Sequence, residues 1–219
     1  MKAVIFDLDG TLIDSAPDIH AAANQVLDGE GLPLVTFEQS RGFVGGGARI
    51  FVERMERAVT GGNDPVLTDH LHKRFLHFYE HAHENTQIYP HVVETLEKLR
   101  AEGWDLGLCT NKPIGPTRAV LKHLGWDTVF SVVIGGDSLP VAKPDPAPLM
   151  AVVEGLGLTV PQIVYIGDSE TDAMTAKRAG ARFGLYTLGY RHAAPEDMFH
   201  HFRFDDYRHL PDHLKDPVA

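Results

Sequence analysis

The sequence predicts an α/β fold, in which a parallel sheet is covered by helices and carries an all-helical module inserted after its first strand. Two observations predict this class. From Ile88 onward, segments with helical and strand periodicity alternate along the chain, as they do in βαβ units. Before them, residues 14–84 hold helical patterns and no convincing strand. Because the strand at residues 3–6 is needed to complete the sheet, the helical module is an insertion.

The predicted core begins with residues 3–6, a short apolar run with β-branched side chains that is typical of a strand buried on both faces. Later strands are predicted at residues 105–109, 132–134, 163–166 and 182–186. Helices that alternate with them are predicted at residues 92–102, 116–124, 147–156 and 171–179. Phe202 and Phe204 are candidates for a further short strand. The core domain is therefore expected to comprise residues 1–13 and 85–219.

The inserted module is expected to be a helical cap domain of residues 14–84. Its first helix is predicted at residues 16–27, where apolar side chains recur at helical spacing. A second helical segment follows Thr36, and a third follows the glycines at residues 45–47. The helical pattern then continues to Glu84. Both linkers between this module and the core are candidates for a hinge.

The composition is that of a globular protein, with 43% hydrophobic residues and a formal net charge of −10. We expect no nucleic-acid binding, because the chain has no basic stripe that could neutralise phosphates. We expect no membrane helix, because no apolar run approaches the roughly 18 residues that a span needs. The single cysteine, Cys109, excludes an internal disulfide, and the first apolar run ends at Asp7, too early for a secretory signal. We therefore expect a cytoplasmic protein.

The first strand ends in two carboxylates, within the segment DLDGT. Alternate side chains of an extended segment share a face, so Asp7 and Asp9 are expected to point the same way. Gly10 lets the backbone turn and approach a ligand closely. Two adjacent anions need a cation, and carboxylate oxygens are the ligands that Mg²⁺ prefers. Taken alone, this segment fits an Asx-rich turn as well as it fits a magnesium site.

Three further segments offer polar side chains at strand ends or in loops. Thr110 and Asn111 follow one predicted strand, Lys143 precedes a proline, and the segment GDSETD supplies Asp168 and Asp172. Ligands of open parallel sheets bind beyond the carboxyl ends of the strands. Each segment alone has a simpler explanation, such as a helix start, a surface lysine or a turn. Together they offer what a phosphate group and Mg²⁺ require, so the sequence predicts phosphate chemistry.

These motifs, in this order, resemble those of the haloacid-dehalogenase-like hydrolases over nearly the whole chain. Within that family, DLDGTLIDSAPD, TNKP, GGDSLPVAKP and LGYR are similar to segments of bacterial phosphoglycolate phosphatases. The resemblance implies a Rossmann-like core with a helical cap, Mg²⁺ as cofactor and an aspartyl-phosphate intermediate. It implies a phosphomonoester hydrolase whose partner is a small phosphorylated metabolite, with 2-phosphoglycolate as the first candidate. We expect a monomer or a homodimer.

Roles for the carboxylates follow from this resemblance. Asp7 is expected to be the nucleophile, and Asp9 is expected to donate a proton to the leaving alkoxide and later take one from water. Mg²⁺ would bind the side chain of Asp7 and the backbone carbonyl of Asp9. Asp168 would complete the metal site, with Asp172 as an outer or alternative ligand.

Other residues are expected to bind the phosphate and the rest of the substrate. The residues predicted to bind the phosphoryl group are Gly10, Thr110, Asn111 and Lys143. Lys143 would also act in catalysis by offsetting the negative charge of the nucleophile and the phosphate. In the cap, the glycines at 45–47 present N–H groups ahead of a helix, and Arg49 follows, so a small carboxylate could dock there. A flexible turn with a solvated arginine is an equally good interpretation of that segment.

Alternatives stay open at this stage. A phospho-accepting receiver domain also combines aspartates, Mg²⁺, a hydroxyl and a lysine, but its acidic pair and its phosphorylated aspartate lie on different strands. Another small-molecule phosphatase, or a sugar phosphomutase of the same family, fits the same motifs. His77, His81 and Glu84 could form a metal site on a helix, although a solvated histidine-rich face is favoured. Cys109 is favoured as a buried packing residue over a nucleophile.

Overall fold

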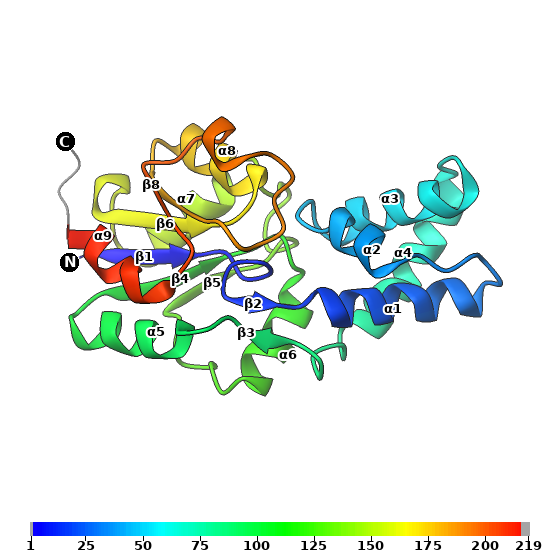
Figure 1. Ribbon diagram of the computed structural model, residues 1–219, viewed down its shortest axis with the longest axis horizontal. Helices are drawn as coiled ribbons and strands as arrows, with labels where there is room; N and C mark the ends of the chain where they lie inside the picture. The colour runs from blue at the N-terminus through cyan, green and yellow to red at the C-terminus, as the bar shows by residue number, and fades with distance from the viewer. Residues whose placement is uncertain (1, 216–219) are drawn as a thin grey trace.

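The computed structural model describes residues 2–215 and has two parts that lie side by side, a sheet with helices and a bundle of helices (Figure 1). The sheet consists of β1 (Ala3–Phe6), β4 (Asp105–Cys109), β5 (Val132–Ile134), β6 (Ile163–Gly167), β7 (Arg182–Tyr186) and β8 (Phe202–Phe204). The helices packed on it are α5 (Val92–Ala101), α6 (Ile114–His123), α7 (Ala147–Gly155), α8 (Glu170–Ala179) and α9 (Leu210–Lys215). The predicted fold class is confirmed.

All neighbouring strands of the main sheet are parallel, in the order β5-β4-β1-β6-β7-β8. The chain leaves β1 toward β4 and β5 and then crosses to the other side for β6, β7 and β8. In such sheets the ligand site lies beyond the carboxyl ends where the strand order reverses. Phe6 on β1 is level with Leu108 on β4 and Ile166 on β6. The residues that follow these three strands therefore emerge together.

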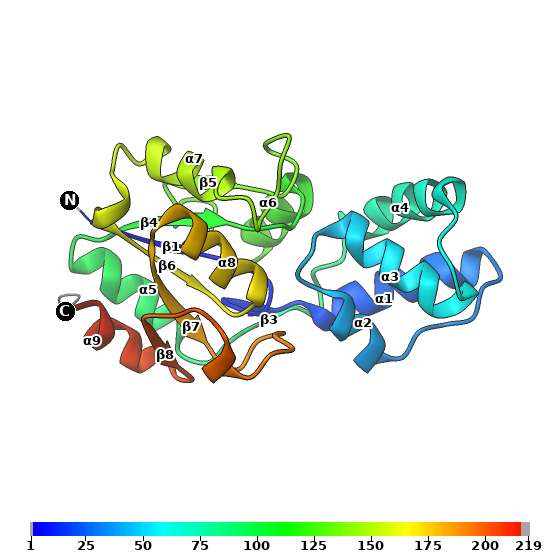
Figure 2. The same cartoon turned by 90° about the horizontal axis from the view of Figure 1, so that it is seen from above.

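The two faces of the sheet have separate cores. Val4 and Phe6 face one core, which is closed by α5, α6 and α9. Ala3 and Ile5 face the other core, which is closed by α7 and α8. Figure 1 shows this layering, with α8 above the sheet and α5 below it, and Figure 2 looks onto the sheet, whose strands follow one another from β5 at the top to β8 at the bottom. Because β1 is buried on both faces, its continuous apolar run is explained by its central place.

The helical insert consists of α1 (Ala16–Gly29), α2 (Phe37–Phe43), α3 (Ala48–Thr60) and α4 (Pro65–Tyr79). Thr36 caps α2 by accepting a hydrogen bond from the amide of Gln39, whose side chain accepts one from the Thr36 amide. The insert has its own apolar core, in which Phe75 stacks on Phe51 and contacts Tyr79, each at a ring separation of 5.0 Å. This ladder of rings fixes Tyr79 at the end of α4.

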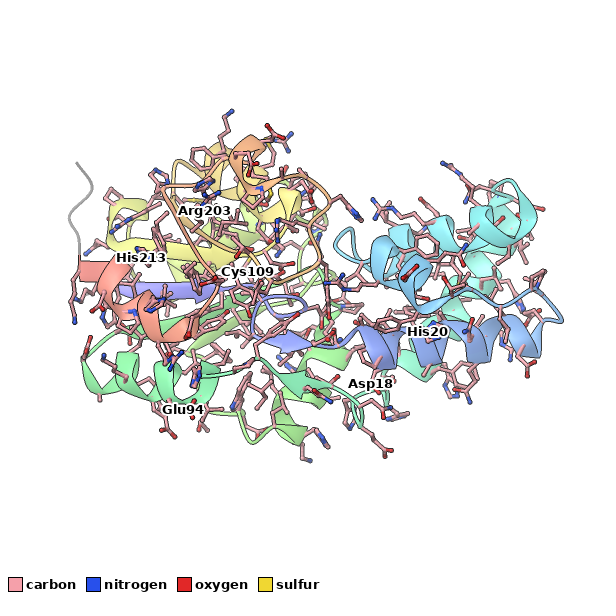
Figure 3. All side chains as sticks on the ribbon, viewed as in Figure 1. Asp18, His20, Glu94, Cys109, Arg203 and His213 are labelled. Carbon is pink, nitrogen blue, oxygen red and sulfur yellow. The ribbon has the colours of Figure 1, made fainter. Side chains whose placement is uncertain are left out.

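Two linkers join the insert to the sheet, and they pair with each other. Strand β2 (Ile13–Asp14) runs antiparallel to β3 (Gln87–Ile88). Asp18, which Figure 3 labels at the start of α1, accepts hydrogen bonds from the amide of Asn85 and from the hydroxyl of Thr86 over 2.7 Å. The outgoing and returning linkers are therefore tied into one connection.

Two details differ from the predictions. Helix α4 ends at Tyr79 rather than continuing to Glu84, and the short strands β2 and β3 were not predicted. Strands of two residues show no period-2 alternation, so the pattern could not reveal them. The domain boundaries predicted at residues 13–14 and 84–85 fall in these linkers and stay a prediction. No helix within residues 2–215 is both long and apolar enough to cross a lipid bilayer.

Candidate active site

Three neighbouring strands end in polar residues at one edge of the sheet. Asp7 follows β1, Thr110 follows β4 and Asp168 follows β6, and all three residues are buried. The amide of Asp7 still donates to the carbonyl of Ile166 over 2.8 Å, so the sheet ladder continues into the site. The strand ends that the sequence singled out therefore meet at the centre of this edge.

Three carboxylates converge there. Asp7, Asp168 and Asp172 each offer an oxygen within 4.8 Å of the other two. Asp172 lies in the first turn of α8, where the amide and the hydroxyl of Ser169 donate to its Oδ2 over 3.1 and 2.6 Å. Three carboxylates at this spacing repel one another unless cations offset their charge.

Lys143 supplies one such cation from the loop after β5. Its Nζ donates to Oδ1 of Asp172 over 2.7 Å, to the hydroxyl of Tyr165 over 2.8 Å and to the carbonyl of Cys109 over 2.9 Å. It also forms an ion pair with Oδ1 of Asp7, at 2.9 Å. An ammonium has three N–H groups and all are engaged, so this oxygen accepts no hydrogen bond from the described residues. Asp7 is thus a buried carboxyl with an open lone pair.

The pKa values of the three carboxyls indicate that Lys143 alone does not balance their charge. Burial raises the pKa of Asp7 to about 7, and the charge of Asp172 adds to this against the effect of Lys143. Burial and the two neighbouring carboxylates raise the pKa of Asp168 well above its usual range. For Asp172 burial acts in the same direction, but Lys143 lowers its pKa on balance. An all-oxygen donor set with excess negative charge fits a hard divalent cation such as Mg²⁺.

Asp168 is held firmly in place. The hydroxyl of Thr11 donates to its Oδ1 over 2.7 Å, and the amide of Tyr190 donates to its Oδ2 over 2.6 Å. Gly10 and Gly189 pack so closely that a Cβ at either position would overlap this carboxylate. Gly10 has a φ of 87°, which glycine adopts without strain. Glycine at position 10 thus leaves room for the carboxylate of Asp168, and the predicted role of Gly10 in binding phosphate stays a prediction.

A pocket lies above Asp7, between the sheet and the helical insert, and is partly open to solvent. The insert contributes an apolar wall that includes Ile19, Val44, Phe51 and Phe75. The sheet side contributes polar residues, namely Asp7, Asp9, Thr110, Asn111 and Lys112. The catalytic candidates thus form the floor of a pocket that the insert closes.

Comparison with known proteins agrees with this geometry. Residues 1–180 match the family model described as haloacid dehalogenase-like hydrolase. This chain belongs to that family. The hydrolase is 46% identical to a phosphoglycolate phosphatase of Cereibacter sphaeroides over the full length of both chains. It is 43% identical to a phosphoglycolate phosphatase of Rhodobacter capsulatus, over 95% of this chain and 94% of the relative.

Among solved structures, the hydrolase is similar to one described as a predicted phosphoglycolate phosphatase from Haemophilus somnus 129PT. The two share 32% sequence identity with a TM-score of 0.91, over 98% of each chain. The predicted family and the predicted resemblance to phosphoglycolate phosphatases are confirmed.

Tyr190 connects the carboxylate site of the hydrolase to the linker that enters the insert. Its amide binds Asp168, while its hydroxyl accepts hydrogen bonds from the amides of Ser15 and Ala16 over 2.9 and 3.0 Å. The same hydroxyl donates to Oδ1 of Asp14 over 2.7 Å. One buried residue of the LGYR segment thus holds both a candidate metal ligand and the start of α1.

Replacing Tyr190 with phenylalanine is expected to lower the free energy of unfolding by about 1–3 kcal/mol, because the Ser15 amide loses its acceptor and the Ala16 amide keeps only its 3.2 Å bond to Asp14. Urea-induced unfolding measures this change. The matched control is Tyr89→Phe, since the Tyr89 ring packs on Tyr186 at 5.2 Å but its hydroxyl makes no hydrogen bond within residues 2–215. Equal stability losses in both variants would contradict the assigned role of the Tyr190 hydroxyl.

Asn111 uses its side chain to position Lys143. Its Oδ1 accepts from the amide of Lys143 over 3.0 Å, and its Nδ2 donates to the Lys143 carbonyl over 2.9 Å. Nδ2 also lies 3.2 Å from the carbonyl of Gly45, on the glycine loop of the insert. The predicted role of Asn111 in binding phosphate stays a prediction. The side chain supports Lys143 and contacts the insert.

Asp9 lines the pocket with Asp7, but its side chain points to the insert and does not join the three converging carboxylates. Its Oδ1 accepts a hydrogen bond from the hydroxyl of Ser15 over 2.6 Å and lies 3.3 Å from Nζ of Lys112. Lys112 also donates to the hydroxyl of Tyr79 over 2.5 Å. This arrangement leaves the backbone carbonyl of Asp9, rather than its side chain, as the candidate ligand.

Sequence reasoning missed Lys112 and Tyr79. Lys112 directly follows the predicted polar strand end of Thr110 and Asn111, and the segment TNKP contains it, so its position offered a signal that was not used. Tyr79 offered none, because its approach to the site depends on how the insert packs.

Arg49 is not brought to the pocket. It lies on the exposed face of α3 and pairs with Glu53 at 3.3 Å and with Asp69 at 2.5 Å. Successive residues of an α-helix are turned by about 100° around its axis, so Ala48 faces the pocket while Arg49 faces away. The loop with Gly45 and Gly47 does line the pocket, as the sequence suggested.

Two weaker candidates take the structural roles that the sequence favoured. Cys109, labelled in Figure 3, is buried inside the core, and burial raises the pKa of its thiol to about 12. It is therefore a neutral thiol at physiological pH. His77, His81 and Glu84 line a groove beside α4, but in residues 2–215 only the three aspartates converge closely enough to hold a metal ion.

Proposed function

We propose that this hydrolase removes the phosphate of small carboxylate-bearing phosphomonoesters, with 2-phosphoglycolate as substrate, through a phosphorylated Asp7. One observation carries the proposal. Oδ1 of Asp7 is buried at the floor of the pocket, 2.9 Å from Lys143, and accepts no hydrogen bond from the described residues. The relatives described as phosphoglycolate phosphatases support the choice of substrate.

In the first step, an oxygen of Asp7 attacks phosphorus while the bond from phosphorus to the alcohol oxygen breaks. The product is an acyl phosphate on Asp7. Lys143 offsets the negative charge that the nucleophile and the phosphoryl group bring together. Asp172 keeps Lys143 charged and oriented, because its Oδ1 accepts the shortest hydrogen bond that Lys143 donates. Thr110 offers its hydroxyl at the same edge.

Asp9 handles the proton. It donates to the departing alkoxide and, as a carboxylate, then takes a proton from the water that attacks the phosphorylated Asp7. Two neighbouring carboxyls can take separate roles only if their surroundings differ. Here Asp7 lies against Lys143, whereas Asp9 contacts Lys112 and also Ser15, at the start of the insert.

Mg²⁺ is the cofactor we propose, held by Asp7, Asp168 and the backbone carbonyl of Asp9. When bound, it supplies positive charge to the transferring phosphoryl oxygens. The oxygen donors and the raised pKa values of Asp7 and Asp168 support a hard cation. The single cysteine fits a reducing compartment and supports the cytoplasm as the place of the reaction.

The test is a phosphate-release assay with Mg²⁺ on a panel of 2-phosphoglycolate, sugar phosphates, nucleotides and pyrophosphate. We expect multiple turnovers, with kcat/KM for 2-phosphoglycolate at least about tenfold above that for each other substrate, a difference of about 1.4 kcal/mol. A higher kcat/KM for a sugar phosphate or a nucleotide would reject the substrate. Release of no more than one phosphate per protein would instead favour a phospho-accepting receiver.

A further inference from the structure

Lys112 is a buried cation that the chemistry at Asp7 does not use. Its side chain is 2% exposed, and among the described residues that line the pocket it is the only lysine or arginine. Burying an ammonium is costly unless an anion and hydrogen-bond acceptors accompany it. The partners of Lys112 should therefore indicate what the pocket is built to bind.

Lys112 donates three hydrogen bonds within the protein, and two of them are long. Nζ donates to the hydroxyl of Tyr79 over 2.5 Å, but it lies 3.3 and 3.5 Å from the two carboxylate oxygens of Asp9. Charge-assisted bonds between an ammonium and a carboxylate are usually about 2.7–2.9 Å long. Oδ1 of Asp9 meets the hydroxyl of Ser15 more closely, over 2.6 Å. The ion pair of Lys112 with Asp9 is thus weak, and a second anion that approaches Nζ more closely can replace its long hydrogen bonds.

Tyr79 forms a pair with this lysine. Nζ of Lys112 lies 4.1 Å from the centre of the Tyr79 ring, and the ring is held by Phe75 in the core of the insert. The hydroxyl of Tyr79 is 3.4 Å from Oδ2 of Asp9, which is long for a bond between a hydroxyl and a carboxylate. The pair therefore brings together an ammonium from the sheet side and a phenol from the insert.

The position of this pair relative to Asp9 matches the shape of a phosphorylated 2-hydroxy acid. In the proposed reaction Asp9 meets the ester oxygen of the substrate, and in 2-phosphoglycolate the next carbon carries the carboxylate. Lys112, which lies beside Asp9, is therefore placed to face that carboxylate. Lys143 instead forms ion pairs with Asp7 and Asp172. The remaining wall is apolar, with Val44, Phe51 and Phe75.

We propose that Lys112 and Tyr79 form the subsite that binds the carboxylate of the substrate and so set the specificity of the pocket. This inference rests on the function proposed above. It gives Lys112 the task that the sequence had suggested for Arg49, which the structure keeps outside the pocket.

The test compares 2-phosphoglycolate with ethyl phosphate, which has a methyl group in place of the carboxylate. For Lys112→Met we expect the ratio of the two kcat/KM values to fall by about 10- to 100-fold relative to the wild type, as for loss of a hydrogen bond to a charged group. For Tyr79→Phe we expect a fall of about 3- to 10-fold. Lys122→Met, the same exchange at an exposed site on α6, is the matched control and should leave the ratio unchanged.

The possible outcomes separate the two proposals. If the wild type itself does not prefer 2-phosphoglycolate over ethyl phosphate, the proposed substrate and the subsite both fail. If the wild type prefers it and Lys112→Met lowers kcat/KM for both substrates by the same factor, Lys112 only positions Asp9 and the subsite alone is rejected. If Lys112→Met does not fold, Tyr79→Phe replaces it, because this variant keeps the ring and removes only the hydroxyl. An unchanged ratio of the two kcat/KM values in Tyr79→Phe would then reject the subsite.

Discussion

Replacing Asp7 with asparagine is expected to abolish phosphate release from 2-phosphoglycolate, with kcat falling at least about 10⁴-fold. The amide cannot form the acyl phosphate, and no other carboxylate takes its place, because Asp172 is engaged by Lys143 and Ser169 while Asp168 is held by Thr11 and Tyr190. Phosphate release by freshly purified protein measures the effect. More than about 1% of the wild-type kcat would contradict the assignment of the nucleophile.

Thermal unfolding of Asp7→Asn is the control for folding, and the pKa of Asp7 predicts the direction in which the unfolding temperature should change. The pKa of Asp7 rises from 3.8 to about 7 in the folded protein, mainly through burial, so the folded state holds its proton more tightly than the unfolded chain. The stability contributed by Asp7 is therefore present below pH 3.8 and is lost as the pH rises toward 7. At pH 8 without metal, Asp7→Asn should unfold at the same temperature as the wild type or at a higher one. Thermal unfolding then shows that lost activity is not lost folding.

Removal of divalent metal with a chelator is expected to reduce activity to background, at least about 10³-fold, and added Mg²⁺ should restore it. Without the cation, burial and Asp172 hold the pKa of Asp7 at about 7, so less of this carboxyl is ionised for attack, and Lys143 must offset the charge of the phosphoryl group without the metal. Potassium chloride at equal ionic strength is the control and should not restore turnover. Full activity in excess chelator would reject the metal requirement.

Mg²⁺ should also bind more tightly as the pH rises, because Asp7 must lose its proton before it can bind the cation. Below about pH 7 the cation must displace the proton of this carboxyl, and above it the carboxylate is already free. The association constant for Mg²⁺ should therefore rise by up to about tenfold per pH unit between pH 5.5 and 7 from Asp7 alone, and a proton displaced from Asp168 would add to this slope. Calorimetric titration at several pH values measures the slope, and a flat profile across this interval would contradict it.

The sequence predicted the parts of this hydrolase that depend on local pattern. Apolar runs that end in Asp7, Thr110 and Asp168 identified strands, and the rule that parallel strands end at one edge brought those residues together. Lys143 was also predicted, although the side chain of Asn111 that orients it was not. Asp7, Thr110 and Asp168 could be placed because each directly follows a strand, so the order of the strands determines where its side chain lies.

The sequence could not predict what depends on how the insert packs. The side of α3 that faces the pocket is decided by helix packing, so Arg49 was assigned to a site that Ala48 faces instead. Tyr79 reaches the pocket only because Phe75 and Phe51 stack within the insert. The pairing of β2 with β3 joins residues far apart in the chain through strands too short to show a pattern.

Tyr190 has a consequence for recombining this protein with its relatives. Its hydroxyl binds the first residues of the insert, and Arg41 of α2 donates to the carbonyl of Gly189 over 2.8 Å in the same segment. A chimaera that joins a foreign insert to this sheet keeps Tyr190 but loses the arginine unless the new α2 supplies one. In such a chimaera, this protein's own sequence is therefore better kept through Ala16, beyond the predicted domain boundary. The foreign insert should also carry an arginine at the position of Arg41.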